Sequence, residues 1–507
     1  MAAVDLLLAG ARIVTLDPQR PAAEALGVRG DRIVALGSYA ELRPLIGPGT
    51  EIVDGAGKVV LPAFHDAHCH LLSYARSLSS LDCRKMRSIG EIQSALAREA
   101  RKLPTGAWIR ASGYDDRLLT EARQPDRCDL DAAAPNRAVR LQHRSLHLDV
   151  LNSLALSQLG LMAITTPQVE RDPRTGQPTG RLYHAADLLR DRMPHQSFAE
   201  TARDVRLASE RLLAWGVTSV QDASVSNGGE EWELFHRLAE EGVLGVRVFV
   251  MAGERHWREV EDGQPASAAV RRGPVKFMAN ESTTDQNELR AAVAAARAAG
   301  KSVAIHAVSE AEVAMALDAV GDGEGSAGGG PNRIEHGAVI PDALLEAVRA
   351  AGVTVVRQPS LVHERGDAYL AEYPPEQQGW LHRARSLLAA GVPYAIGSDA
   401  PVTEPAPALA LLSARRRRTG DGALLGPDEA LDEGPALEAV TIEPARAAGV
   451  GHELGQLRPG ALADVVVLDP DVLEEAWFEN KPTPSPSPTW GRQASLTITS
   501  GRVVWRR

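Results

Sequence analysis

The chain has 507 residues, with 55 basic and 66 acidic side chains, a formal net charge of −11 and 44% hydrophobic residues. This composition is typical of a globular protein, and an acidic chain without a basic stripe argues against a nucleic-acid partner. The absence of a long uncharged apolar stretch argues against a membrane partner, and the N-terminal residues do not resemble a secretory signal. The three cysteines form no CxxC pair, which fits a reducing compartment, so we expect a cytoplasmic protein.

Short alternating apolar runs lie near both ends of the chain. They cover residues 6–15 and 31–36 near one end, and 463–469 and 496–505 near the other. Runs of this kind, bounded by glycine or charge, are typical of strands in a small antiparallel sheet. We therefore predict that residues 1–58 and 451–507 together build one β-sandwich domain.

Between the two ends, short apolar runs alternate with helical stretches rich in Ala, Arg, Glu and Leu. The predicted strands lie at 59–64, 217–221, 246–250, 275–278, 302–305, 333–335, 353–356 and 394–396. Alternation of this kind indicates a parallel sheet, and eight strands close a barrel. The predicted fold is an α/β protein with a (β/α)₈ TIM barrel over 59–450, interrupted after strand one by an inserted subdomain at about 82–195 that mixes helices and loops.

Four histidines and one aspartate lie at the carboxyl ends of these strands, where active groups of such barrels sit. They are His68, His70, His306, His336 and Asp399. A single histidine at a strand end more often bonds a backbone carbonyl than a metal, but the repetition in barrel order favours a metal. Because side chains at i and i+2 of an extended chain share a face, His68 and His70 can bind one ion. Imidazoles and a carboxylate suit zinc or another borderline divalent ion.

An ordered set of motifs carries a resemblance that spans essentially the whole chain. The matching segments are 6–15, 61–70, 143–147, 216–222, 275–276, 305–307, 333–336, 358–359, 397–401 and 455–464. Each motif alone is weak, but the ordered set resembles the amidohydrolase superfamily, and within it the YtcJ-like branch that includes N-substituted formamide deformylases.

The resemblance implies a binuclear metal site with two divalent ions, of which zinc is the expected kind. His68, His70 and Asp399 would bind one ion, and His306 and His336 would bind the other. Lys276, between Val275 and Phe277 on its predicted strand, would carry a carboxyl group from carbon dioxide and bridge both ions, which explains a lysine in the barrel interior.

The resemblance also implies the reaction. Two ions about 3.5–4 Å apart can share a hydroxide while one of them polarises a carbonyl. Asp399 would take the proton of that hydroxide and deliver it to the leaving nitrogen. We expect hydrolysis of a non-peptide carbon–nitrogen bond in a small-molecule amide such as an N-substituted formamide, and a homodimer is compatible with the family.

Two alternatives stay open. Mononuclear deaminases of heterocyclic amines carry a glutamate three residues after the strand-five histidine, whereas this chain has Ser309 there and glutamate only at Glu310. A barrel that lost its chemistry and acts as a binding protein is the other alternative, although all six candidate ligands are present. Residues 280–281 and 307–310 depart from the usual pattern of the branch, so the sequence does not identify the amide.

Further residues are candidates for substrate contacts. They are Tyr114, Asp115, His143 and His147 in the insertion, and Arg357 and Gln358 at the end of strand seven. The last two should face the mouth of the barrel. We expect His382 at the surface.

Overall fold

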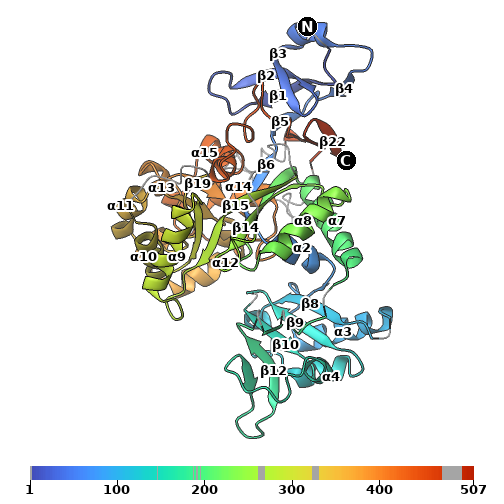
Figure 1. Ribbon diagram of the computed structural model, residues 1–507, viewed down its shortest axis with the longest axis vertical. Helices are drawn as coiled ribbons and strands as arrows, with labels where there is room; N and C mark the ends of the chain where they lie inside the picture. The colour runs from blue at the N-terminus through green and yellow to red at the C-terminus, as the bar shows by residue number, and fades with distance from the viewer. Residues whose placement is uncertain are drawn as a thin grey trace. The chain divides into compact units, whose positions relative to one another are not determined.

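The computed structural model describes residues 3–104, 106–145, 147–185, 188–189, 192–194, 196–260, 269–321, 330–470 and 494–507. By its contacts, the chain divides into two compact units. The first unit contains residues 1–71 and 209–507, and the second contains residues 72–208. The insertion predicted at about 82–195 lies within the second unit. Figure 1 shows the elements of both units.

The two ends of the chain build a single sheet in the first unit. Its strands are β1 (Leu6–Val14), β2 (Ala22–Arg29), β3 (Arg32–Gly37), β4 (Glu51–Asp54), β5 (Val59–Pro62), β20 (Val465–Leu468), β21 (Leu496–Thr499) and β22 (Arg502–Arg506). The order is β22-β21-β20-β5-β1-β2-β3, with β4 on β1. β20 pairs antiparallel with β5, so the C-terminal strands join the N-terminal ones directly. Alternating apolar residues of these strands, such as Leu6 and Leu8, fill one buried cluster.

A parallel sheet of eight strands forms the barrel, as the sequence predicts. Its strands are β6 (Phe64–Cys69), β13 (Val217–Asp222), β14 (Arg247–Gly253), β15 (Val270–Met278), β16 (Val303–Ala307), β17 (Arg333–His336), β18 (Thr354–Arg357) and β19 (Tyr394–Ile396). The first and last strands approach each other through a parallel bridge between Cys69 and Ala400. The amide of Asp399 donates to the carbonyl of His68 at 2.7 Å, and the amide of His70 donates to the carbonyl of Ala400 at 2.9 Å. The closure therefore lies where three of the candidate ligands meet.

The first barrel strand differs from its prediction. Residues 59–62 belong to β5 of the terminal sheet, and the barrel begins with β6 instead. The sequence shows one apolar run over 59–64 because both strands are buried, and periodicity does not mark where one strand ends and the next begins. As a result His65 and His68 lie within a strand rather than after it.

Helices connect most of the barrel strands or follow the last of them, and several are labelled in Figure 1. They are α8 (Gly229–Glu240), α9 (Gln286–Ala298), α10 (Glu310–Val320), α11 (Asp342–Ala350), α12 (Ser360–Glu372), α13 (Arg385–Ala389), α14 (Pro407–Arg416), α15 (Glu433–Ala439) and α16 (Ile442–Ala447), with short turns η3 (Pro375–Trp380) and η4 (Pro427–Glu429). Ser309 caps α10 by accepting from the amide of Glu312, whose carboxylate accepts from the amide of Ser309 in return. Such a reciprocal cap satisfies two amides that a helix start leaves unpaired. α1 (Tyr39–Leu42) and η1 (Arg43–Leu45) lie beside the terminal sheet.

The second unit contains a sheet that the sequence did not predict, since a mixture of helices and loops was expected. Its strands are β7 (Leu81–Asp82), β8 (Ile109–Tyr114), β9 (Val139–His143), β10 (Leu148–Leu151), β11 (Val169–Arg171) and β12 (Pro178–Tyr183), in the order β11-β12-β10-β9-β8-β7. These strands are short, and arginines interrupt their apolar pattern, which weakens the periodic signal. α3 (Ile89–Lys102), η2 (Asp116–Leu118), α4 (Arg127–Ala133) and α5 (Ser153–Gln158) complete the unit. α2 (Leu71–Leu78) and α7 (Phe198–Ala214) span the two unit boundaries.

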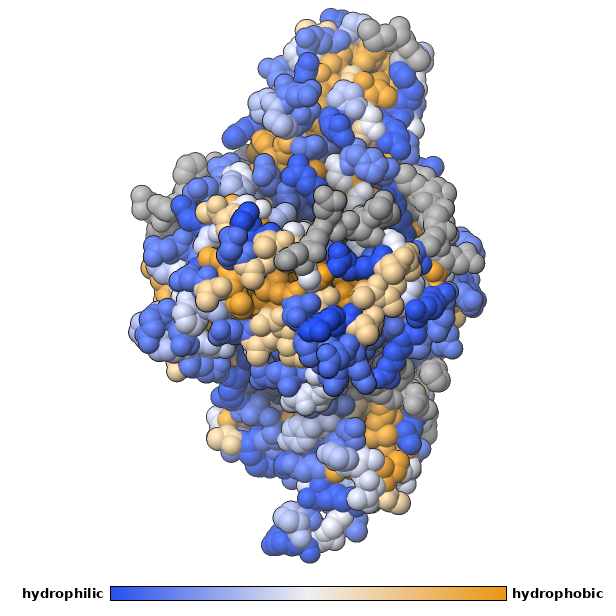
Figure 2. Space-filling model, turned by 60° about the vertical axis from the view of Figure 1, so that its left-hand side comes forward, coloured by the Kyte–Doolittle hydropathy of each residue, from blue (hydrophilic) through white to orange (hydrophobic). Residues whose placement is uncertain are grey.

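Hydrophilic residues dominate the face drawn in Figure 2, with apolar residues gathered in patches between them. Among the described residues, no helix is both long and apolar enough to cross a membrane. All three cysteines are free thiols, of which Cys69 and Cys83 are buried and Cys128 is exposed.

Candidate metal centre

Five barrel strands bring the six predicted ligands to one region of the first unit. β6 carries His68 and leads into His70, β15 carries Lys276, β16 carries His306, β17 ends at His336, and β19 leads into Asp399. The backbones of His336 and Asp399 have φ values of 70° and 57°, in the left-handed region that side chains other than glycine rarely adopt. Such conformations cost about 1–3 kcal/mol each and are found most often at functional sites.

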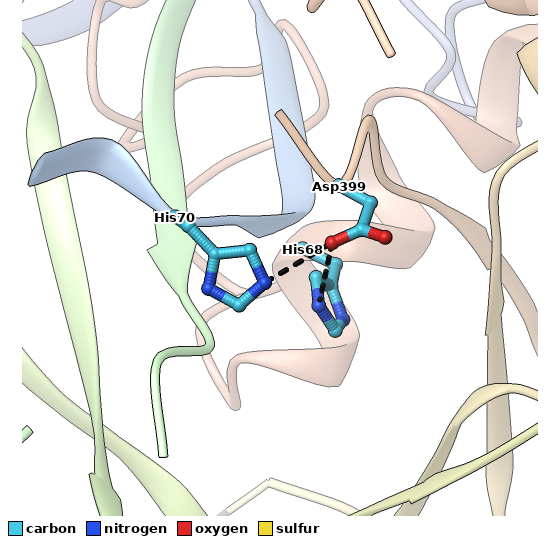
Figure 3. A group of neighbouring side chains, drawn as sticks. All are labelled: His68, His70 and Asp399. Atoms are coloured by element: carbon cyan, nitrogen blue, oxygen red, sulfur yellow. Dashed lines mark ion pairs between the residues drawn. The ribbon is translucent and has the colours of Figure 1, made fainter. Parts of the chain in front are cut away.

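His68, His70 and Asp399 form the tightest group of these ligands. One carboxylate oxygen of Asp399, Oδ1, lies 3.4 Å from Nε2 of His68 and 3.1 Å from Nε2 of His70. Figure 3 shows both imidazoles turned toward this carboxylate. The ligand atoms of the three residues all lie within 4.8 Å of one another. Two imidazoles and a carboxylate arranged in this way suit a zinc-like ion.

His306 and His336 lie next to His68 in the same region of the barrel. Their ring centroids are 4.6 Å apart, and the rings of His68 and His336 are 4.8 Å apart. Burial lowers the pKa of His336 to about 4 and holds that of His306 well below its usual value. Both rings are therefore neutral near pH 7, which is the form that binds metals.

Lys276 is the exceptional side chain of this region. It is 2% exposed, and its Nζ has no hydrogen-bond partner among the residues that the structure describes. Burial lowers the pKa of Lys276 to about 8. A buried ammonium without a partner is unfavourable, so the site fits an additional group that would occupy this nitrogen. The buried donors and the unpartnered lysine thus fit a divalent metal centre.

The charge of Asp399 suits a metal ligand. Burial raises its pKa, but hydrogen bonds from His68 and His70 outweigh burial and hold the pKa well below its usual range. The carboxylate of Asp399 is therefore ionised at neutral pH. Burial also lowers the pKa of His68, but the carboxylates of Glu335 and Asp399 outweigh burial and raise the pKa of His68 overall.

Neighbouring side chains fix the orientation of three of the imidazoles. Nδ1 of His70 lies 3.0 Å from Oγ of Ser224, and Nδ1 of His336 lies 2.8 Å from Oε1 of Gln358. Nδ1 of His68 contacts Oε2 of Glu335. In each case Nδ1 is engaged and Nε2 is left for the site, as is common for histidines that bind metals.

Glu335 was not among the sequence candidates. In a regular strand, Glu335 and His336 would point to opposite faces, so only one of them could reach the site. The left-handed backbone of His336 breaks this alternation and allows both to contact the same group of histidines. The motif at 333–336 marked the segment but gave no role to its glutamate.

Asp66 is a second residue that sequence reasoning missed. Its carboxylate accepts from the amide of His68 at 3.1 Å and from the amide and hydroxyl of Ser398 at 2.9 and 2.6 Å. Asp66 therefore ties the strand that carries His68 to the loop that carries Asp399. Its signal in the sequence is its position between His65 and His68 at the end of the first apolar run.

The two candidates at the end of β18 have different surroundings. Gln358 contacts His336, as described above. Arg357 is fully buried, donates to the carbonyl of Ala338 at 3.4 Å, and has a pKa lowered to about 9 by burial. His382, expected at the surface, is 2% exposed and packs against the ring of Tyr369. That expectation was wrong because the residues before His382 give no periodic signal of burial.

The other four substrate candidates lie in the second unit. The ligand atoms of Asp115, Asp116 and His143 lie within 4.8 Å of one another, and Nε2 of His143 is 3.1 Å from Oδ1 of Asp116. Tyr114 is buried, and its hydroxyl donates to the side chain of Gln124 at 2.7 Å. His147 packs against the ring of His184. Contacts of these residues with a substrate stay a prediction.

Comparison with known proteins identifies the family and similar folds. A model of the amidohydrolase family matches residues 51–505. The chain is 30% identical to N-substituted formamide deformylase from Arthrobacter pascens over 94% of this chain and 95% of that protein. It is 24% identical to the putative amidohydrolase YtcJ from Bacillus subtilis, over 92% and 95% of the two chains. A crystal structure of an uncharacterised metal-dependent hydrolase from Pyrococcus horikoshii superimposes with a TM-score of 0.76 at 26% identity, covering 92% of this chain and 98% of that one.

Proposed function

Because this chain belongs to the amidohydrolase family and is a metal-dependent hydrolase of carbon–nitrogen bonds other than peptide bonds, we propose that it hydrolyses small amides of the N-substituted formamide type. The observation that carries the proposal is the group of His68, His70 and Asp399 beside a buried Lys276 that has no hydrogen-bond partner in the described part of the chain. Divalent ions, with zinc as the proposed kind, supply the activation of water and the polarisation of the amide carbonyl when bound.

The residues divide into two sets of ligands. His68, His70 and Asp399 would hold one ion, and His306 and His336 would hold the other. Lys276 would bridge them after its neutral amine adds carbon dioxide, which forms a carbamate and releases a proton. The lowered pKa of Lys276 supports this step, because a substantial fraction of the amine is unprotonated near pH 8.

Asp399 has the proton-transfer role in the proposal. Its carboxylate is ionised and lies next to two ligands, so it can accept the proton of the attacking water. The protonated carboxyl can then donate to the leaving nitrogen, and the amine departs neutral. The products are formate, or the corresponding carboxylic acid, and a primary amine.

The local structure favours hydrolysis of an amide over hydrolytic deamination of a heterocyclic amine. Three residues after His306, where such deaminases carry a glutamate, Ser309 caps α10 through its hydroxyl. Glu310 is the first residue of that helix, outside the spacing that deaminases use. A binding protein without catalysis is disfavoured because all six ligands remain together in one region.

Activity on a panel of N-substituted formamides tests the proposal, with release of amine and formate as the readout. The wild-type protein should turn over at least one member, lose activity with a chelator and regain it with Zn²⁺. Asp399→Asn should abolish turnover while much of the metal stays bound. Release of ammonia from heterocyclic amines without cleavage of any formamide or related amide would contradict the proposal and favour the deaminase.

The partner and the assembly of the protein are tested separately, the partner by the same substrate panel and the assembly by a measurement of molecular mass in solution. We propose that the partner of the barrel is a small molecule, with a homodimer as the proposed assembly. Light scattering of the purified protein tests the assembly, and a monomer at micromolar concentration would refute it.

A further inference from the structure

A buried ion pair contacts one of the proposed metal ligands, His68, but is not itself part of the proposed ligand set. Arg333 and Glu335 are both 0% exposed, and Nη2 of Arg333 donates to Oε2 of Glu335 at 3.1 Å. The same Nη2 donates to the carbonyl of Ala67 at 2.6 Å. The same Oε2 of Glu335 also contacts Nδ1 of His68, while its Oε1 accepts from Nε of Arg333. The pair therefore connects the backbone of β6 to the ring of a ligand on β6.

The side chain of Gln221 also contacts this ion pair. Nη1 of Arg333 donates to Oε1 of Gln221, and Nε2 of Gln221 donates to the carbonyl of Pro444 at 2.8 Å. β13 and α16 thus hold the guanidinium, and the guanidinium holds Glu335. Each member has its polar atoms engaged by another, which limits the rotamers that Glu335 can adopt.

Stability alone does not explain such a pair. Removing two charges from water costs more than their attraction often returns, and well-packed apolar residues would frequently serve stability as well. The geometry of the pair instead points to the imidazole that it contacts. A carboxylate that accepts from Nδ1 of a ligating histidine fixes the tautomer and the orientation of the ring.

We propose that Glu335 is a positioning residue for metal binding, which keeps the proton of His68 on Nδ1 and its Nε2 lone pair turned toward the ion, and that Arg333 holds Glu335 in this place. The inference rests on the proposed function only in that His68 binds a metal. It adds a residue that controls metal affinity without touching the ion or the substrate.

The variant Glu335→Gln tests the proposal with Zn²⁺ itself as the probe. The dissociation constant of Zn²⁺ from this variant, measured by competition with a chromophoric chelator, should rise by about 10–100-fold. This is the usual effect of replacing a residue that hydrogen-bonds the second ring nitrogen of a metal-binding histidine. The Co²⁺-loaded variant should also have a changed visible absorption spectrum, because the ligand field at His68 changes. A Zn²⁺ affinity and a Co²⁺ spectrum equal to those of the wild type would overturn the proposal.

A matched control separates positioning from general destabilisation. Asp464→Asn disrupts another buried ion pair of the same unit, between Asp464 and Arg247 at 2.9 Å. This control should bind Zn²⁺ with wild-type affinity. An equal loss of affinity in the control would overturn the positioning role, and a wild-type protein that binds no Zn²⁺ at all would overturn both this inference and the proposed function.

A second measurement does not depend on the folding of Glu335→Gln, because its readout comes from the wild-type protein. In the Zn²⁺-loaded wild-type protein with ¹⁵N-labelled histidine, the His68 resonances are assigned by comparison with His68→Asn. The proton of His68 should be found on Nδ1 and the metal on Nε2. A proton on Nε2 would overturn the inference while leaving the proposed function intact.

Discussion

The ion pair between Arg247 and Asp464 links the barrel to the terminal sheet, and its disruption should lower stability measurably. Arg247 begins β14, and Asp464 directly precedes β20. The two side chains are 3% and 5% exposed. Asp464 also accepts from the amide of Ser500 at 2.9 Å, and Arg247 donates to Oγ of Ser219 at 3.0 Å and to Oγ of Ser500 at 3.1 Å. Four connections thus meet at one buried pair.

The size of the effect follows from this burial. Removing one partner of a buried ion pair costs about 3–5 kcal/mol, because the other charge stays buried without compensation. The first unit has about 370 residues, which corresponds to an unfolding entropy of about 0.8 kcal/mol per degree. Asp464→Asn should therefore lower the melting temperature of this unit by about 4–6 °C.

Differential scanning calorimetry of metal-free protein is the appropriate assay, since it measures the melting temperature without a contribution from bound metal. A double variant, Asp464→Asn with Arg247→Met, should melt higher than expected from the sum of the two single variants, because it leaves no unpaired charge. An Asp464→Asn protein that melts within about 1 °C of the wild type would refute the reasoning.

Three further predictions concern other parts of the chain. Gly253→Ala would place a Cβ 1.8 Å from the carbonyl oxygen of Val225, so this variant should lower the melting temperature. Gly49→Ala is the control, because no described atom lies within 4 Å of its added Cβ, and it should leave the melting temperature unchanged. Equal melting temperatures of the two variants would contradict the clash at Gly253. Cys128, the exposed thiol, should react with a thiol reagent in the folded protein while the two buried cysteines react only after unfolding, and mass spectrometry that finds three rapid adducts would exclude this. Burial raises the pKa of Glu429, but hydrogen bonds from the start of α13 outweigh burial and lower it. Its ionised form therefore stabilises the fold above the unfolded pKa of about 4.3, and this stabilisation is lost as the pH falls through the lower folded value. The melting temperature of Glu429→Gln should thus fall below that of the wild type at pH 7, and the gap should narrow in acid; a gap that is constant with pH would show that the charge is not responsible.

The barrel and the meeting of the candidate ligands in one region could be predicted because each signal is local. An apolar run followed by His306 or Asp399 identifies a strand end, and a parallel barrel brings strand ends together. The segment 65–70 likewise predicts two candidate ligands on one face of an extended chain. These features need no knowledge of distant contacts.

The remaining features depend on backbone geometry or on partners far along the chain. Glu335 and His336 both contact the histidine group, and the left-handed backbone of His336 departs from the strand alternation that would place only one of them there. The strand at 59–62 joins the terminal sheet because β20, some 400 residues away, pairs with it. The role of Asp66 likewise depends on Ser398, across the closure of the barrel.

Metal content per chain, measured on protein purified with bicarbonate, tests the central claim most directly. The wild type should contain about two ions per chain, and Lys276→Ala should contain one or none, because the bridging group would be lost. Equal contents of one ion in both proteins would contradict the bridged centre and move heterocyclic amines to the front of the substrate search.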